Sequence, residues 1–127
     1  MAALTHLDTH VAVWLYANRQ DLLSDTVRER LEVDRLAISP MAVLELTYLR
    51  EIGRITEDGP TVLAGLGADI GLEADPAPFA EIVDIAHACT WTRDPFDRVI
   101  AAHAIAVGAT LLTRDASLRD HVPAALW

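Results

Sequence analysis

The sequence contains no lysine, and this absence limits how the protein could bind nucleic acid. All ten basic residues are arginine, 19 residues are acidic, and the formal net charge is −9. A general electrostatic binder of nucleic acid usually carries a basic stripe, so the composition argues against that class. Any nucleic acid must therefore be held by a few local side chains. Arginine suits phosphate recognition, but a compositional bias of the source genome explains its exclusive use equally well.

Cysteine is almost absent as well, because Cys89 is the single one in the chain. An intramolecular disulfide is therefore excluded, and the apolar neighbours Ile85 and Ala86 predict a buried, reduced thiol. Long apolar runs are also missing, and none approaches the roughly 20 residues of a membrane span. The first residues lack the basic start of a signal peptide and are interrupted by Asp8. We therefore expect a soluble, unexported protein of the cytoplasm.

What the sequence does contain is an alternation of short apolar runs and helical patterns. The length of 127 residues and the 52% hydrophobic content predict a single domain over residues 1–127. Three apolar runs predict buried strands, and each is followed at once by a residue suited to starting a helix. The predicted strands cover Leu4–Leu7, Leu36–Ser39 and Ala109–Thr113.

Helices are predicted between and after these strands. They cover residues 9–17, 24–34, 40–52, 77–88 and 96–107, whereas the Gly/Pro-rich stretch 57–78 is expected to form loops and short helices. Strands that alternate with helices favour a central, mostly parallel sheet with helices on both faces, which is an α/β fold. In such sheets the working site lies beyond the carboxyl ends of the strands.

Several acidic residues fall at that edge or on apolar helices. Asp8 and Asp115 each follow a predicted strand, although each alone could be a simple helix N-cap. Glu45 lies on a mostly apolar helix with no basic residue one turn away, and an unpaired buried carboxylate is costly. A functional role for Glu45 is therefore favoured over a position on a solvent-facing edge.

The segment TRDPFDRVIAAHA contains two acids with different expected roles. Asp94 precedes proline and is predicted to cap the helix N-terminus. Asp97 shares a helical face with the apolar residues Ile100 and Ala104, so its carboxylate is predicted to face inward at the positive end of the helix. Asp97 is therefore the stronger candidate for a functional site, and Asp94 is a secondary one.

Carboxylates that meet at one sheet edge require a positive partner. At about 4 Å and an effective dielectric constant near 20, each like pair costs about 4 kcal/mol. A set of oxygen ligands suits Mg²⁺ or Mn²⁺, and such a site supports phosphodiester hydrolysis through an activated water. Local arginines would guide the phosphates; the candidates beside the acids are Arg93, Arg98 and Arg114. The five histidines show no zinc-binding spacing and are interpreted as surface or core-edge residues: His6, His10, His87, His103 and His121.

Four segments occur in the order LDTHVAVWL, SPMAVLELTYL, RDPFDRVIAAHA and GATLLTRDASL. Together they resemble the PIN-domain toxins of the VapC type. The resemblance implies a three-layer PIN-like fold and a Mg²⁺- or Mn²⁺-dependent endoribonuclease. It also implies a homodimer and an antitoxin, encoded beside the toxin, whose tail occupies the acidic groove.

The resemblance also assigns the site residues. It places the metal and the catalysis at an acidic quartet, which consists of Asp8, Glu45, Asp97 and Asp115. Thr9 and Thr113 match small hydroxyl residues that could orient a carboxylate or a bound water. With Asp94 and Arg114, these threonines form the secondary candidates.

Other classes of protein fit less well. A phosphoacceptor receiver domain needs a lysine, which the chain lacks, and a haloacid-dehalogenase-type phosphatase needs an acid where His10 stands. A non-catalytic PIN-like binding module, acting through protein partners, remains the alternative. Dependence on a divalent metal would distinguish it from the nuclease. The sequence does not identify the RNA, the antitoxin or the number of metal ions.

Overall fold

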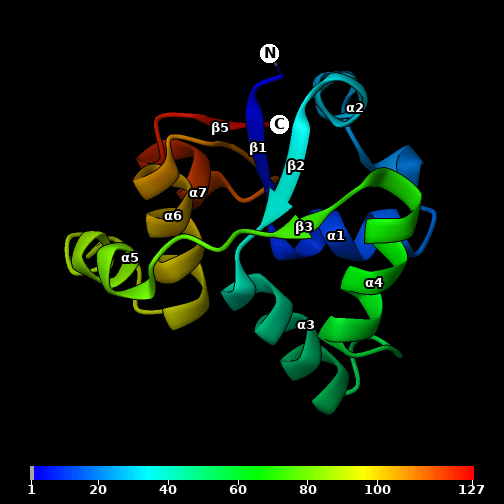
Figure 1. Cartoon of the computed structure of the whole chain (residues 1–127). Coiled ribbons are helices and arrows are strands. Elements are labelled where there is room, and N and C mark those ends of the chain that lie inside the picture. Colours follow the sequence, from blue (N-terminus) through cyan, green and yellow to red (C-terminus); the bar gives the residue numbers. More distant parts are fainter. Residues whose placement is uncertain (1) are drawn as a thin grey trace.

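A five-stranded parallel sheet lies at the centre of the computed structural model, which describes residues 2–127 (Figure 1). The strand order is β3-β2-β1-β4-β5, and β1 pairs with β2 on one side and with β4 on the other. The predicted mostly parallel sheet is therefore confirmed. The strands are β1 (Leu4–Leu7), β2 (Arg35–Ile38), β3 (Glu73–Ala74), β4 (Thr110–Leu112) and β5 (Ala125–Leu126).

Helices cover both faces of this sheet. Helices α5 and α6 pack together on one side, while α1 and α4 pack together on the other (Figure 1). The helices are α1 (Thr9–Tyr16), η1 (Gln20–Leu22), α2 (Asp25–Val33), α3 (Pro40–Glu51), α4 (Gly59–Ile70), α5 (Phe79–Ala86), α6 (Pro95–Val107) and α7 (Ala116–His121). This layered α/β arrangement is the predicted one.

Side-chain caps fix where the helices next to the strands begin. Asp8 caps α1, Ser39 caps α3, Asp94 caps α6 and Asp115 caps α7, each by accepting a hydrogen bond from a backbone N–H of the first turn. The left-handed backbone of Gly108 ends α6 directly before β4. The predicted helix starts are therefore confirmed at these positions.

The prediction for residues 57–78 was partly wrong, because α4 is one continuous helix of 12 residues. Its glycines allow close packing rather than forming loops. A Cβ atom on Gly59 would lie 2.0 Å from the Val43 carbonyl oxygen, and one on Gly65 would lie 2.8 Å from the ring of Tyr16. The low helix propensity of glycine concealed a helix whose composition is set by its contacts with α1 and α3.

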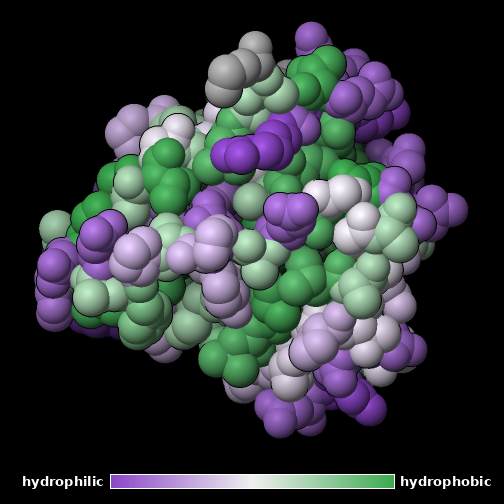
Figure 2. All heavy atoms as spheres, in the orientation of Figure 1, coloured by the Kyte–Doolittle hydropathy of each residue, from purple (hydrophilic) through white to green (hydrophobic). Residues whose placement is uncertain are grey.

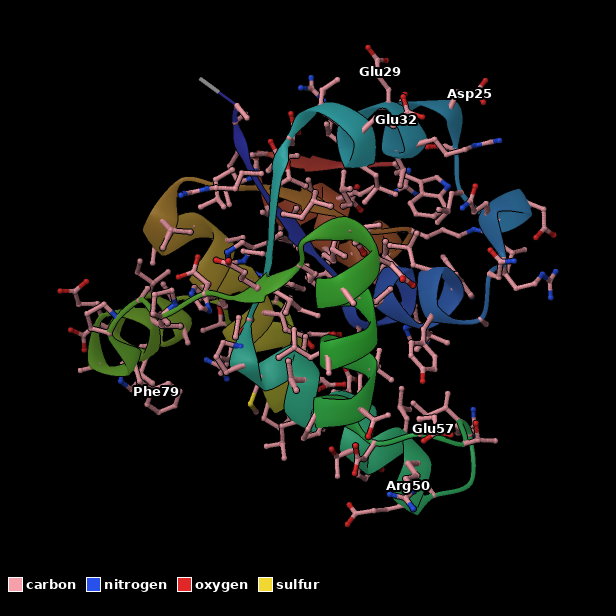
Figure 3. All side chains as sticks on the ribbon, turned by 45° about the vertical axis from the view of Figure 1, so that its right-hand side comes forward. Asp25, Glu29, Glu32, Arg50, Glu57 and Phe79 are labelled. Atoms are coloured by element: carbon pink, nitrogen blue, oxygen red, sulfur yellow. The ribbon has the colours of Figure 1, made fainter. Side chains whose placement is uncertain are left out.

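A large apolar core packs around the sheet, a smaller cluster lies between α5 and α6, and Cys89 is buried in the smaller one as predicted. Polar side chains project from the edges: Asp25, Glu29 and Glu32 extend into solvent from α2 (Figure 3). An apolar surface instead lies over α3 in the lower centre of Figure 2. Three large apolar residues on α3 or directly after it are exposed: Leu44, Tyr48 and Ile52. Across residues 2–127, no helix combines the length and apolar character that a membrane crossing requires.

Candidate functional site

One cavity at the carboxyl edge of the sheet gathers most of the acids singled out from the sequence. It has a volume of about 510 Å³, and it lies where β1 and β4 end and α3 and α6 begin. The structure thereby brings the acidic quartet together with two secondary candidates. The lining residues are Asp8, His10, Glu45, Asp94, Asp97, Arg114 and Asp115.

Asp8 is the most rigidly held carboxylate of this acidic cavity. It directly follows the central strand, and only 6% of the residue is exposed. Asp8 Oδ2 accepts a hydrogen bond of 2.7 Å from the Thr113 hydroxyl, and Oδ1 accepts one of 2.8 Å from the Thr9 backbone N–H. Burial raises the pKa of Asp8, although these two hydrogen bonds act in the opposite direction.

The second carboxylate, Glu45, is oriented by a neighbouring helix. The Thr9 hydroxyl, fully buried at the start of α1, donates a hydrogen bond of 2.5 Å to Glu45 Oε1. Burial, and then the negative charges of Asp8 and Asp94, raise the pKa of Glu45. Glu45, which has no basic residue one helical turn away, therefore faces other acids rather than solvent alone. Each of the two predicted threonines thus orients one acid.

The remaining acids lie at the starts of α6 and α7. Asp94 Oδ1 accepts hydrogen bonds from the backbone N–H groups of Phe96 and Asp97, at 2.8 and 3.3 Å. Asp115 Oδ1 accepts one of 3.0 Å from Leu118, and the Asp115 N–H donates to the Thr113 hydroxyl. Asp94 and Asp115 are therefore structural caps as well as cavity residues, whereas Asp97, like Glu45, caps no helix.

Asp97 has the most clearly shifted pKa of the acids in the cavity. Its pKa is raised to about 7, first by burial and then by the negative charges of Asp94, Asp8, Asp115 and Glu45. Its helix buries Ile100 and Ala104 as predicted. A carboxylate whose ionised form is disfavoured by burial and by neighbouring carboxylates is a group that a bound cation would stabilise in that form.

The donor set of the cavity fits a hard divalent cation. Its acidic side chains offer oxygen ligands, and no cysteine lines it. The carboxylates are spread around the cavity wall, since within residues 2–127 no three of them bring ligand atoms within 4.8 Å of one another. This spacing leaves room for an ion that keeps several of its waters, as Mg²⁺ does.

The three arginines predicted to guide phosphates differ in their positions and contacts. Arg114 lines the acidic cavity, where its guanidinium group can meet a phosphate. Arg98 instead donates to the Ala86 carbonyl oxygen and ties α6 to α5, and Arg93 donates to the Thr90 carbonyl oxygen. The prediction that all three guide phosphates is therefore not supported for Arg98, whose contacts are structural.

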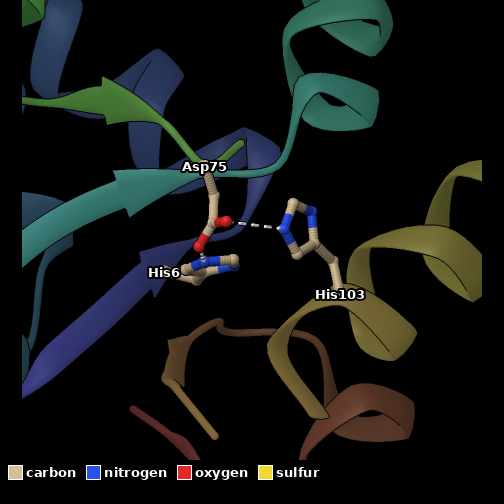
Figure 4. A group of neighbouring side chains, drawn as sticks. All are labelled: His6, Asp75 and His103. Carbon is tan, nitrogen blue, oxygen red and sulfur yellow. Dashed lines mark hydrogen bonds and ion pairs between the residues drawn. The ribbon is translucent and has the colours of Figure 1, made fainter. Parts of the chain in front are cut away.

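The histidine interpretation was wrong for two of the five residues. His6 and His103 are each 1% exposed, and both lie against the carboxylate of Asp75 (Figure 4). We call this group the His–Asp–His cluster. Its members come from β1, from the segment after β3 and from α6, so no local spacing revealed it. His10, predicted at the surface, is exposed and lines the acidic cavity.

Comparisons with known proteins agree on one family. The profile of the PIN domain matches residues 6–122. The ribonuclease VapC22 of Mycobacterium tuberculosis is 33% identical over 129 residues, which cover 95% of this chain and 96% of that protein.

Two solved structures share the fold. VapBC2 from Rickettsia felis, bound to a DNA fragment from the promoter of its genes, has a TM-score of 0.68 at 20% identity and covers 97% of this chain and 96% of the other. DNA-bound VapBC from Salmonella typhimurium has a TM-score of 0.59 at 21% identity and covers 98% and 96%.

Proposed function

This chain belongs to the PIN-domain family and is of the VapC type, and from that premise we propose that it is a metal-dependent endoribonuclease. We further propose that it acts as the toxin of a type II toxin–antitoxin pair. The observation that carries the proposal is the acidic cavity, in which the acidic quartet and Asp94 line one space. The relative from Mycobacterium tuberculosis bears the name ribonuclease, which supports the same activity here.

The acidic quartet would hold Mg²⁺ or Mn²⁺. When bound, such an ion supplies an activated water and stabilises charge on the phosphate. The chain's own residues do the positioning: Thr113 and Thr9 hold Asp8 and Glu45 in fixed orientations through their hydroxyl groups. Arg114, at the wall of the cavity, would bind a phosphate oxygen of the RNA and offset the repulsion from the net charge of −9.

The proposal is tested by RNA cleavage with the purified chain. We expect cleavage in Mn²⁺ or Mg²⁺, loss of cleavage in EDTA, and recovery when Mn²⁺ is added back. Cleavage that continues unchanged in EDTA would exclude a metal-dependent nuclease. A chain that binds its protein partner but cleaves no RNA with any divalent metal would be the non-catalytic binding module.

The charge of the cavity also supports an antitoxin partner. A cluster of acids with one arginine complements a basic peptide segment, so we propose that an arginine-bearing tail of the antitoxin occupies the acidic cavity and displaces RNA. Mixing the chain with the product of the neighbouring short gene should abolish cleavage, and raising the salt concentration should weaken that inhibition.

A second copy of the chain is the partner proposed for the apolar surface. Leu44 on α3 is 55% exposed and Phe79 on α5 is 65% exposed, and both line an apolar cavity of about 360 Å³. The Phe79 side chain projects outward from α5 (Figure 3). Exposed apolar patches of this kind mark protein interfaces. We expect a dimer by light scattering for the natural chain and a monomer for the Leu44→Glu/Phe79→Glu double variant.

A further inference from the structure

We propose that the His–Asp–His cluster is a second metal site, separate from the acidic cavity and suited to Zn²⁺ or a similar transition-metal ion. The cluster consists of His6, Asp75 and His103, and each residue offers one ligand atom (Figure 4). These atoms all lie within 4.8 Å of one another. Two imidazole nitrogens and a carboxylate oxygen form a donor set that zinc and iron sites use.

The orientation of the three side chains is the first support. His6 Nε2 lies 2.8 Å from Asp75 Oδ2, and His103 Nε2 lies 3.1 Å from Asp75 Oδ1. The two imidazole rings meet edge to face, at a centroid distance of 4.8 Å. Both Nε2 atoms therefore face the same carboxylate, so the three donor atoms lie close enough together to bind one ion.

Unpartnered nitrogens are the second support. His103 is buried, and its Nε2 atom lies near Asp75 without being aligned for a hydrogen bond. Neither Nδ1 atom of the two histidines has a hydrogen-bond partner within the described part of the chain. Buried polar atoms are usually satisfied, so a nitrogen that points into a cluster without a bond is consistent with a missing partner.

The surroundings allow an ion and a fourth ligand to reach the cluster. His103 lines the apolar cavity of about 360 Å³ between α3 and α5. Asp75 lines a different cavity, of about 470 Å³, along the edge formed by β2 and β3. The cluster thus lies between two hollows of the surface, and a water molecule from either side could complete a tetrahedral site.

A metal at this position would act as a structural clamp. The three ligands belong to the central strand, to the segment between β3 and α5, and to α6. The two-residue strand β3 pairs with β2 over two residues, and the Asp75 side chain adds a contact from the segment after β3 to the central strand. An ion bound to the folded state alone stabilises that state by mass action.

Hydrogen bonding without metal is the competing arrangement, and Co²⁺ binding separates the two. Co²⁺ is added to metal-free protein during refolding, and visible absorption is recorded. A nitrogen-ligated, four-coordinate Co²⁺ ion absorbs far more strongly than one held by carboxylates and water. We expect about one equivalent of strongly absorbing Co²⁺, which Zn²⁺ displaces, with a Tm raised by roughly 5–10 °C at 100-fold excess over Kd.

Matched variants assign the ion to its ligands. The absorption should persist in Asp97→Asn, which alters the acidic cavity, and in His87→Gln, which alters an exposed histidine. It should be lost in His103→Gln. If that variant does not fold, ¹⁵N spectra of the natural chain decide instead: Zn²⁺ should move the Nε2 resonances of His6 and His103 and leave those of His87 and His121 unchanged.

Three outcomes would overturn the proposal. The first is the absence of any strong Co²⁺ absorption in the natural chain together with unmoved Nε2 resonances, which would leave a purely hydrogen-bonded cluster. The second is absorption that disappears in Asp97→Asn, because the ion would then belong to the acidic cavity. The third is absorption that persists in folded His103→Gln.

Discussion

Strand β1 with the residue that follows it, and helix α6, each contribute to two clusters of opposite character. In the acidic cavity, Asp8 and Asp97 meet other carboxylates, whereas in the His–Asp–His cluster His6 and His103 surround a single acid. The first cluster gathers like charges and oxygen ligands, and the second pairs complementary groups in a buried position. The same two elements thus support one site that opposes folding and another that stabilises it.

Two aspartates show the difference most directly. Asp97 has a pKa raised to about 7 by burial and by four neighbouring acids. For Asp75, burial acts to raise the pKa, but the hydrogen bonds from His6 and from the Ala77 backbone, together with the neighbouring His103, outweigh burial and hold the pKa below its ordinary value. The ionised form is therefore unfavourable at one position and favourable at the other, which is typical of a functional site beside a structural one.

The largest effect is expected from Asp97→Asn on activity. Loss of a proposed metal ligand should lower RNA cleavage in Mn²⁺ by about 100-fold or more, since even residues that only orient a metal ligand commonly contribute 10–100-fold. Initial cleavage rates at saturating RNA give the comparison. Asp120→Asn, an exposed acid on α7 outside the cavity, is the matched control and should cleave at the natural rate. Equal loss in both variants would refute a specific role of Asp97.

Asp75→Ala should instead act on stability. It removes the acceptor of the buried His6 Nε2 and of the Ala77 N–H, so we expect the free energy of unfolding to fall by about 2–4 kcal/mol. Urea denaturation in EDTA measures this change. Glu73→Ala, an exposed neighbour two residues earlier, should change it by less than about 0.5 kcal/mol. If both variants unfold at the same urea concentration, Asp75 has no stabilising role.

Thr113→Val is expected to change both RNA cleavage and the free energy of unfolding. The variant keeps the shape but removes the hydroxyl that donates to Asp8 and accepts from Asp115. We expect a loss of about 1–3 kcal/mol in the free energy of unfolding and a decrease in cleavage of roughly tenfold or more. Thr113→Ser should restore most of both. A natural cleavage rate in folded Thr113→Val would show that the hydroxyl does not position Asp8.

The smallest expected effect is a gain in stability from Asp97→Asn in EDTA. Asp97 ionises near 3.8 when unfolded and near 7 when folded, so folding takes up a proton between these values. Stability is therefore lost as the pH rises through this window, and it stays low above about 7. The neutral asparagine avoids this loss. Because the side chain is partly exposed, we expect a gain of only about 1–2 kcal/mol at pH 8 and almost none at pH 4.

Urea denaturation of both proteins across this pH range measures the gain. A stability difference between Asp97→Asn and the natural chain that does not change between pH 4 and pH 8 would contradict the account of Asp97.

The sequence predicted what local patterns encode. Strand ends and helix caps placed Asp8, Asp94 and Asp115, and an acid on an apolar helix marked Glu45. Convergence of these acids followed from the geometry of parallel sheets, in which the carboxyl ends of the strands share one edge. The acidic cavity could therefore be expected before its geometry was known.

Other features depend on contacts between distant segments. The strands β3 and β5 have two residues each, too few for an alternating pattern to be recognised. The glycines of α4 reflect close packing on other helices, which a propensity scale cannot represent. His6, Asp75 and His103 come from three separate segments, so only the folded chain reveals their proximity.

Mn²⁺ binding tests the central claim, that the acidic quartet holds the catalytic ion, most directly. Titration of Mn²⁺ followed by electron paramagnetic resonance counts free ions in the presence of the natural chain, Asp97→Asn and His103→Gln. The account predicts that Mn²⁺ binds to the natural chain and to His103→Gln and that binding is at least tenfold weaker in Asp97→Asn. Unchanged Mn²⁺ affinity in Asp97→Asn would contradict it.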